Sequence, residues 1–175
     1  MGGPWPDPAG LGRRPNGSSD DGNCPHPRRY GRIRGDRRPR LHTVIPHLLA
    51  EALALAGKIE EGLAALDHAL ATAAVSGERG WNAEIHRLRG ELTTRLPQTD
   101  PAKAEESFRT ALAIAREQST RGYELRAATS LARLWLKQGR RGEACDLLAP
   151  VYAWFTAGFD TADLKEAAAL LAELT

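Results

Sequence analysis

The sequence predicts an all-α protein whose helices pair into repeating hairpins, on the strength of two observations. After about residue 43 the chain is rich in Ala, Leu, Glu and Arg, and its apolar residues recur at steps of three and four, as in amphipathic helices. In addition, a pattern of small and large apolar residues occurs three times, at spacings of 42 and 40 residues. A recurrent pattern of this length is typical of helical solenoids, in which each hairpin buries its apolar face against the next.

The first 41 residues differ from the rest of the chain. They contain nine arginines, no lysine and four acidic residues, a balance of +5, whereas the other 134 residues carry a balance of −3. Seven prolines would interrupt any helix there, and neither helical nor strand periodicity is present. The sequence therefore predicts a disordered Arg/Pro/Gly-rich arm over 1–41 and a single folded domain over 42–175.

Capping residues divide the folded domain into seven predicted helices. Asp100 and Pro101 supply a helix N-cap followed by a proline in the first turn. Pro97 closes the preceding helical run, and a glycine follows each of four other runs, where a left-handed C-cap favours glycine. The predicted helices cover 43–56, 58–76, 80–96, 101–119, 121–138, 140–157 and 160–174.

The second helix of each predicted hairpin carries a stripe of small, large and small residues. Such a stripe is expected where a first helix approaches too closely to leave room for larger side chains. The three stripes are Gly62, Leu66 and Ala69; Ala104, Phe108 and Ala111; and Ala144, Leu148 and Val151. The matching first helices are marked by small residues 12 or 14 positions upstream, namely Ala50, Gly90 and Ala132.

These features predict a tetratricopeptide-like helical-hairpin solenoid of about seven helices. The repeat spacings of 42 and 40 residues exceed the roughly 34 of the common tetratricopeptide repeat, which indicates lengthened helices. The last helix, 160–174, has no partner and is expected to cap the stack. We expect Trp135 to lie in the core, and Trp154 with Phe155 and Phe159 to pack the last helix against the stack.

First helices form the concave surface of such an array, and counting around each helix from its small residue predicts which side chains face inward. This surface is acidic at one end and basic at the other, which suits a peptide or helix of complementary charge. The alternative is that these are ordinary solvated helix residues. The predicted partner-binding residues are His47, Glu51, Glu84, Arg87, Glu91, Arg126, Thr129, Arg133 and Lys137.

Neighbouring charges along the helices indicate helix stabilisation rather than catalysis. Adjacent glutamates, at 60–61 and 105–106, fall in the opening turns of second helices, where the helix dipole favours negative charge. Three glutamates stand four positions before an arginine, a spacing that allows ion pairs on a helix surface. The predicted pairs are Glu91 with Arg95, Glu105 with Arg109 and Glu117 with Arg121.

No catalytic, cofactor-binding or metal-binding motif is recognisable, so the sequence predicts neither an enzyme nor a cofactor. The run 12–19 has the glycine spacing of a phosphate-binding loop, but Ser18 replaces the lysine. The histidines are scattered, and Cys24 and Cys145 lack a metal-type spacing, which also argues against a disulfide framework and favours a reducing cytoplasm. No apolar run approaches the roughly 18 residues of a membrane span.

The arm contains one candidate for nucleic-acid binding, the run 27–40. Its arginines can neutralise phosphates, and Tyr30 can stack on a base. The same composition is also explained by an arm that is merely solvated. A third explanation is a misassigned start or a frame error ahead of a genuine domain. A nucleic-acid-associated protein that uses the repeats as a partner surface is thus the alternative to a protein-interaction module.

The stretches 124–135 and 138–167, which include Trp-Phe-Thr-Ala-Gly-Phe-Asp-Thr at 154–161, resemble one known family. They are similar to the C-terminal repeats of bacterial signalling proteins that join a class III adenylate or guanylate cyclase domain to a predicted ATPase. The resemblance covers 47–174 and implies a regulatory or scaffolding array, whose partner is a protein, a peptide or the missing cyclase and ATPase domains. No stretch matches the catalytic motifs of either domain, so no catalytic residue carries over. The arm departs from the family pattern and indicates a detached fragment.

Overall fold

A computed structural model describes residues 41–175 of the chain, with side chains from His47 onward. Of the predicted disordered arm, residues 1–40 lie outside this range. The described part forms seven α-helices and contains no strand, which confirms the predicted all-α architecture. The helices are α1 (Leu41–Leu55), α2 (Ile59–Ser76), α3 (Asn82–Thr93), α4 (Pro101–Glu117), α5 (Arg121–Lys137), α6 (Arg141–Ala153) and α7 (Ala162–Leu174).

The start of α4 and the end of α2 follow from their capping residues. One carboxylate oxygen of Asp100 accepts hydrogen bonds from the amides of Ala102 and Lys103, at 3.1 and 3.3 Å, and Pro101 occupies the first turn. Gly77 ends α2 in the left-handed conformation, with a φ of 74° that residues with a side chain rarely adopt. Both ends agree with the sequence prediction.

Two helices are shorter than predicted because a proline lies near the end of each. The predicted helix 80–96 is α3, which ends at Thr93, since the amides of Arg95 and Leu96 bond to carbonyls three residues back and tighten the turn ahead of Pro97. The predicted helix 140–157 is α6, which ends at Ala153. Its Pro150 has no amide hydrogen to donate, and the amide of Phe155 bonds to the carbonyl of Tyr152.

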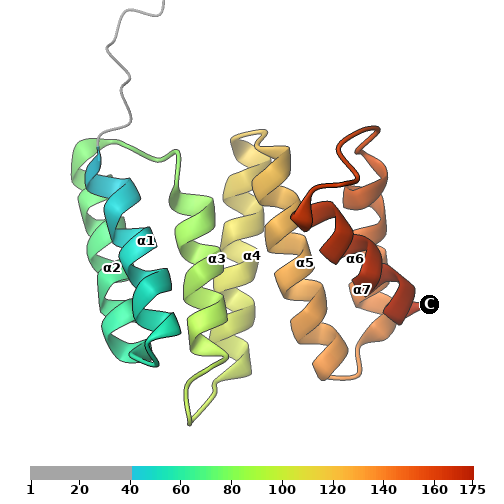
Figure 1. The fold of residues 1–175 in the computed structure, drawn as a ribbon, viewed down its shortest axis with the longest axis horizontal. Coiled ribbons are helices and arrows are strands. Elements are labelled where there is room, and N and C mark those ends of the chain that lie inside the picture. Colours follow the sequence, from blue (N-terminus) through green and yellow to red (C-terminus); the bar gives the residue numbers. More distant parts are fainter. Residues whose placement is uncertain (1–40) are drawn as a thin grey trace, which may run out of the picture. The chain divides into compact units, whose positions relative to one another are not determined.

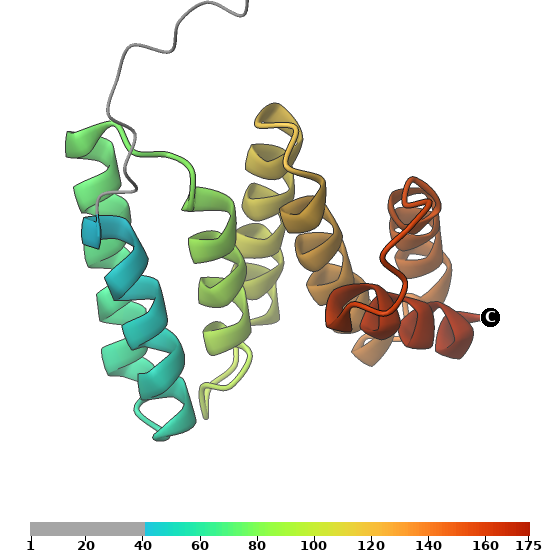
Figure 2. The same cartoon turned by 45° about the horizontal axis from the view of Figure 1, so that its top comes forward.

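First helices (α1, α3, α5) alternate along the chain with second helices (α2, α4, α6), and the two sets form two layers (Figure 1). Each helix packs against its neighbours in sequence, and α1, α3, α5 and α7 also contact one another in that order. Within residues 41–175, the second helices make no comparable contact with one another. The first helices therefore converge as the inner layer, which α7 continues after α5 (Figure 2).

Close approach of the helices explains the small residues in the repeat pattern. A Cβ atom added to Gly90 of α3 would lie 2.6 Å from the ring of Phe108 on α4, a side chain that is itself 2% exposed. A Cβ atom on Gly62 of α2 would lie 3.3 Å from the backbone oxygen of Ala50 on α1. The small-residue positions thus mark the points where first and second helices meet, as the sequence predicts.

The last helix closes the core with its own leucines rather than with the aromatic residues that precede it. Leu164, Ala167, Leu170 and Leu174 are buried and belong to the same apolar cluster as α4, α5 and α6. The prediction that Trp154 and Phe159 pack α7 against the stack is wrong, because they are 56% and 47% exposed. They lie in the connection that follows the early end of α6, and of the three predicted aromatic residues only Phe155 packs against the cluster.

Trp135 lies in the core, as predicted, and its ring is covered by cations from neighbouring elements. The side chain is 6% exposed. The guanidinium of Arg140 lies 4.5 Å from the ring centroid, and that of Arg109 on α4 lies 5.4 Å away. Glu105 of α4 pairs with both arginines, at 2.8 Å from Arg109 and 3.0 Å from Arg140. This cluster therefore links the second hairpin to the third.

Candidate partner-binding groove

Three adjoining hollows line the inner layer and together form a groove. The largest, about 470 Å³, lies between the C-terminal ends of α3 and α5, and a second of about 390 Å³ extends from α1 across α3 and α5 to α7. A third hollow of about 60 Å³ lies between α3, α5 and α7. Glu91 lines all three, and Arg133 lines both of the larger ones. We call this continuous surface the inner groove.

Most of the side chains that the sequence predicts to face a partner do line the inner groove. Seven of the nine contribute to its walls: Glu51, Arg87, Glu91, Arg126, Thr129, Arg133 and Lys137. The other two, His47 and Glu84, are 6% and 2% exposed and line none of the three hollows. Arg87 and Thr129 line the groove but are only 6% and 5% exposed, so little of either side chain is accessible to a partner. The predicted set thus divides into a buried floor and an accessible rim.

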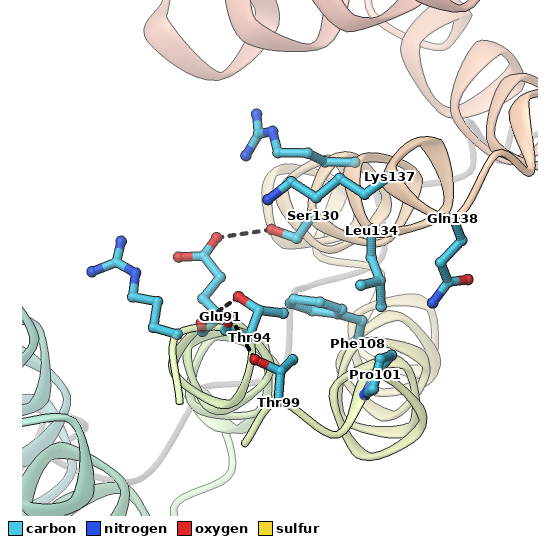
Figure 3. Close-up of a pocket in the computed structure, with 11 residues that line it drawn as sticks. Glu91, Thr94, Thr99, Pro101, Phe108, Ser130, Leu134, Lys137 and Gln138 are labelled. Carbon is cyan, nitrogen blue, oxygen red and sulfur yellow. Dashed lines mark hydrogen bonds between the residues drawn. The ribbon is translucent and has the colours of Figure 1, made fainter. Parts of the chain in front are cut away.

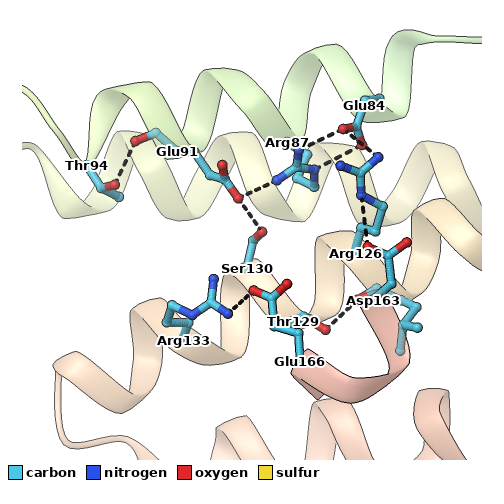
Figure 4. A network of polar contacts seen from close by, with 11 residues as sticks. Glu84, Arg87, Glu91, Thr94, Arg126, Thr129, Ser130, Arg133, Asp163 and Glu166 are labelled. Atoms are coloured by element: carbon cyan, nitrogen blue, oxygen red, sulfur yellow. Dashed lines mark hydrogen bonds and ion pairs between the residues drawn. The ribbon is translucent and has the colours of Figure 1, made fainter. Parts of the chain in front are cut away.

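The floor is a network of charged side chains that satisfy one another (Figure 4). Arg87 donates hydrogen bonds to both carboxylate oxygens of Glu84, at 2.7 and 2.9 Å, and a further one to Glu91. The same carboxylate of Glu91 accepts a hydrogen bond of 3.0 Å from the hydroxyl of Ser130 on α5. Arg126 of α5 lies 2.9 Å from Glu84. These contacts fix α3 to α5 along the bottom of the groove.

Two acidic residues of α7 extend the network to the end of the groove. Asp163 lies 3.7 Å from Arg126, and Glu166 forms an ion pair with Arg133 (Figure 4). Both arginines belong to α5 and were predicted to face a partner. Their charges are therefore balanced from within the chain, a tertiary arrangement that no spacing along one helix could indicate.

Burial and ion pairing act in opposite directions on Arg87. Removal of its guanidinium from water would by itself lower its pKa, but the hydrogen bond and negative charge of Glu84 outweigh this effect and raise the pKa. Arg87 therefore carries its charge in the folded protein. A permanently charged and fully paired floor holds its geometry without a ligand.

The predicted pairing of Glu91 with Arg95 does not form. Glu91 instead contacts Arg87, four residues before it, and Ser130 of the next first helix. Arg95 is consequently exposed and lines the largest hollow, together with Lys137. Of the other predicted pairs, Glu105 with Arg109 is confirmed, whereas Arg121 pairs with Glu124.

Arg95 lines the groove although its spacing from Glu91 predicts an ion pair on the helix surface. A signal for it is nevertheless present in the repeat. Arg95 stands five residues after the small residue Gly90, and Lys137 stands five residues after the equivalent Ala132. The two cations therefore occupy the same position of successive repeats, although α3 ends before Arg95 and α5 includes Lys137.

The opposite end of the inner layer is aromatic. The ring of His47 stacks on Trp81 at a centroid distance of 4.8 Å and an interplanar angle of 23°, and Tyr123 lies 6.1 Å from Trp81. Burial raises the pKa of Tyr123, and the nearby charge of Glu84 adds to this shift. His47 is therefore part of a packed cluster between α1 and α3, rather than of the accessible rim.

Within the described residues, no group of three His, Cys, Asp or Glu side chains is placed to hold a metal ion. In the same part of the chain, no helix has the length and apolar character needed to cross a membrane.

Comparison with solved structures identifies the architecture. The chain is similar to the crystal structure of a Podosopora anserina protein described as a kinesin light chain with nearly identical TPR-like repeats, with a TM-score of 0.59 over 78% of this chain and 68% of that one. The fold is tetratricopeptide-like. Sequence identity between the two is 21%, so the similarity concerns the fold alone. No family model and no curated protein matches the chain.

Proposed function

We propose that residues 41–175 act as a protein-interaction module that holds a segment of a partner protein in the inner groove. The observation that carries this proposal is the division of the groove into a buried, internally paired floor and an accessible rim. Glu84 and Arg87 are almost fully buried, whereas Arg95 and Lys137 are exposed and line an open hollow of about 470 Å³.

A floor of this kind favours binding by a preformed surface. The ion pairs among α3, α5 and α7 already order the side chains that a partner would otherwise have to immobilise. Binding to such a surface costs less conformational entropy than binding to flexible side chains. The groove is also bounded by helices, which present a peptide or an amphipathic helix with a row of side chains at regular intervals.

Photo-crosslinking distinguishes the groove from the outer surface. A photoreactive phenylalanine is placed at exposed Gln138 in the groove or, as the matched control, at exposed Ala113 on the second helix α4, and full-length protein is irradiated in cells that produce it. We expect a crosslinked polypeptide from position 138 and none from position 113. Crosslinks from position 113 alone would contradict the proposal.

We further propose that the module belongs to a multidomain signalling protein of the cyclase and ATPase type, located in the cytoplasm of a bacterium. The similarity of 124–135 and 138–167 to the repeats of those proteins supports this assignment. Mass spectrometry of the endogenous protein, captured by an antibody against 124–175, gives its size. A polypeptide much larger than 19.0 kDa is expected. A product of 19.0 kDa that begins with the arm would refute the assignment.

The arginine-rich arm supports a second candidate function, nucleic-acid binding with the repeats as a partner surface. Nine arginines within 1–41 would give binding to DNA or RNA that weakens steeply with salt. Deletion of residues 1–40 leaves all seven helices in place and tests the idea by electrophoretic mobility shift. Salt-sensitive binding that persists unchanged after the deletion excludes the arm as its source.

A further inference from the structure

The largest hollow of the groove has walls from three helices and the connection between two of them. α3 contributes Glu91, the α3–α4 connection contributes Thr94, Arg95 and Thr99, and α4 contributes Phe108. α5 and its C-cap form the far wall, with Ser130, Arg133, Leu134, Lys137 and Gln138. Figure 3 shows Phe108 between α3 and α5, with Leu134 beside it and Lys137 extending from α5 on the same side as Ser130. We call this hollow the rim pocket.

The rim pocket has an excess of positive charge that the described residues do not balance. Of its three cations, Arg133 pairs with Glu166, whereas within residues 41–175 neither Arg95 nor Lys137 has an ion-pair or hydrogen-bond partner for its side chain. The one acidic residue of the pocket, Glu91, pairs with Arg87, which also pairs with Glu84, and contacts neither Arg95 nor Lys137. Two unpaired cations therefore remain around one open space, Arg95 just after α3 and Lys137 at the end of α5.

The other polar groups of the pocket narrow the class of anion. The hydroxyls of Thr94 and Thr99 each donate to a backbone carbonyl at 2.7 Å, and that of Ser130 donates to Glu91. These hydroxyls already donate within the chain, so they are not available to the many acceptor oxygens of a phosphate. A singly charged carboxylate needs no more than the two free cations.

The apolar part of the pocket is almost closed to solvent. Phe108 and Leu134 lie side by side at its bottom and are 2% and 8% exposed, and exposed Pro101 forms the edge (Figure 3). Little apolar area remains for a ligand to cover, because the hydrophobic gain is proportional to the area removed from water. The pocket therefore selects a ligand by its charge.

We propose that the rim pocket recognises an acidic segment of the partner protein, in which an Asp or Glu side chain lies between Arg95 and Lys137. This inference rests on the proposed function and specifies the chemistry of the partner. It also assigns Arg95, together with Lys137, as a determinant of specificity.

The test is a selection of random dodecapeptides from a display library on three proteins. These are the full chain, the Arg95→Gln/Lys137→Gln variant and the control variant Arg79→Gln/Lys165→Gln. The control removes the same charge from two exposed cations, on the α2–α3 connection and on α7, that line no part of the groove. Circular dichroism verifies that each variant is folded.

We expect the full chain and the control variant to enrich peptides that contain an acidic residue. Affinity of the best peptide, measured by fluorescence anisotropy, should fall about tenfold in the Arg95→Gln/Lys137→Gln variant. It should fall equally when the peptide's acidic residue is changed to its amide. Competition by inorganic phosphate at concentrations where acetate has no effect would identify a phosphate site and overturn the carboxylate assignment.

The remaining outcomes separate the inference from the proposed function. Enriched peptides without acidic residues, or binding that the Arg95→Gln/Lys137→Gln variant retains in full, would refute the rim pocket while leaving the interaction module in place. A library that yields no enriched peptide on any folded protein would count against the proposed function and against the inference with it.

Discussion

Gly90 determines how closely the first and second helices of the middle hairpin approach. Its missing side chain leaves the space that the Phe108 ring occupies, because an added Cβ atom would lie 2.6 Å from that ring. Phe108 in turn forms the floor of the rim pocket. A single position therefore affects both the stability of the hairpin and the shape of the proposed binding surface.

Replacement of Gly90 by alanine is expected to destabilise the fold by about 1–3 kcal/mol, because the displaced ring has no free space in a packed interior. Urea unfolding followed by circular dichroism measures the change. Gly122→Ala is the matched control, since a Cβ atom there would meet nothing within 4 Å. The control should be neutral or should stabilise the helix by up to about 1 kcal/mol. Equal effects of the two substitutions would argue against the close contact.

Glu105 provides a second test, through pH. Burial by itself would raise its pKa, but the hydrogen bond from Arg109 and the charge of Arg140 hold the pKa below the usual 4.5. A carboxylate with a lowered folded pKa stabilises the protein above its unfolded pKa, and that contribution is lost as the pH falls through the folded value. Glu105→Gln should therefore be less stable than wild type near neutral pH, with the difference shrinking below about pH 4.5.

Thermal unfolding over a pH series gives this difference directly. Glu106→Gln on the same helix is the control, because Glu106 is exposed and forms no ion pair within residues 41–175. If the two variants show the same pH dependence, the ion pairs of Glu105 contribute nothing that depends on its charge.

At the scale of the elements, α7 shows what an unpaired last helix contributes. It covers the apolar faces of α5 and α6 with its own leucines, and it places Asp163 and Glu166 against the arginines of α5. Its outer side exposes Lys165 and Glu173 to solvent. The helix therefore combines a buried apolar face with an exposed polar one.

Leu170→Ala is expected to cost about 2–5 kcal/mol, because the side chain is 5% exposed and its removal leaves a cavity between α7 and the hairpin beneath it. Denaturant unfolding measures the loss. Val75→Ala on α2, where the side chain is 91% exposed, should change stability by no more than about 0.5 kcal/mol. A comparably small effect at Leu170 would mean that α7 does not pack as described.

Element boundaries show which local signals suffice for prediction. The N-cap and proline at 100–101 and the glycine at 77 act within one turn of the helix they bound, so the sequence alone located them. The early ends of α3 and α6 depend on which carbonyls accept hydrogen bonds from the last backbone amides, near a proline in each case. Trp154 is exposed because α6 ends just before it, so its exposure could not be predicted from the residue type alone.

For the whole molecule, the inner layer is joined by charges as well as by apolar packing. Glu84 of α3 contacts Arg87 on its own helix and Arg126 on α5, which in turn contacts Asp163 on α7. Helix periodicity predicted that most of these residues share the inner surface. It could not predict their partners, because a helical residue can pair in either direction along its helix and the choice depends on the neighbouring helix.

Removal of Glu84 should be costly, because it leaves two arginines without one of their partners at a site that is 2% exposed. We expect Glu84→Ala to destabilise the protein by about 3 kcal/mol, measured by chemical unfolding. The exposed pair of Lys58 and Glu61 serves as the comparison, and Glu61→Ala should cost less than about 1 kcal/mol. A stable Glu84→Ala variant would show that the network does not hold the inner layer together.

Hydrogen–deuterium exchange tests most directly whether the inner groove is the binding surface. The full chain is compared with and without a saturating amount of the most enriched library peptide, and exchange is followed in segments of first and second helices. Added protection is predicted in α3 and α5, around 84–95 and 126–138, with α2, α4 and α6 unchanged. Protection confined to the second helices would contradict a partner-binding inner groove.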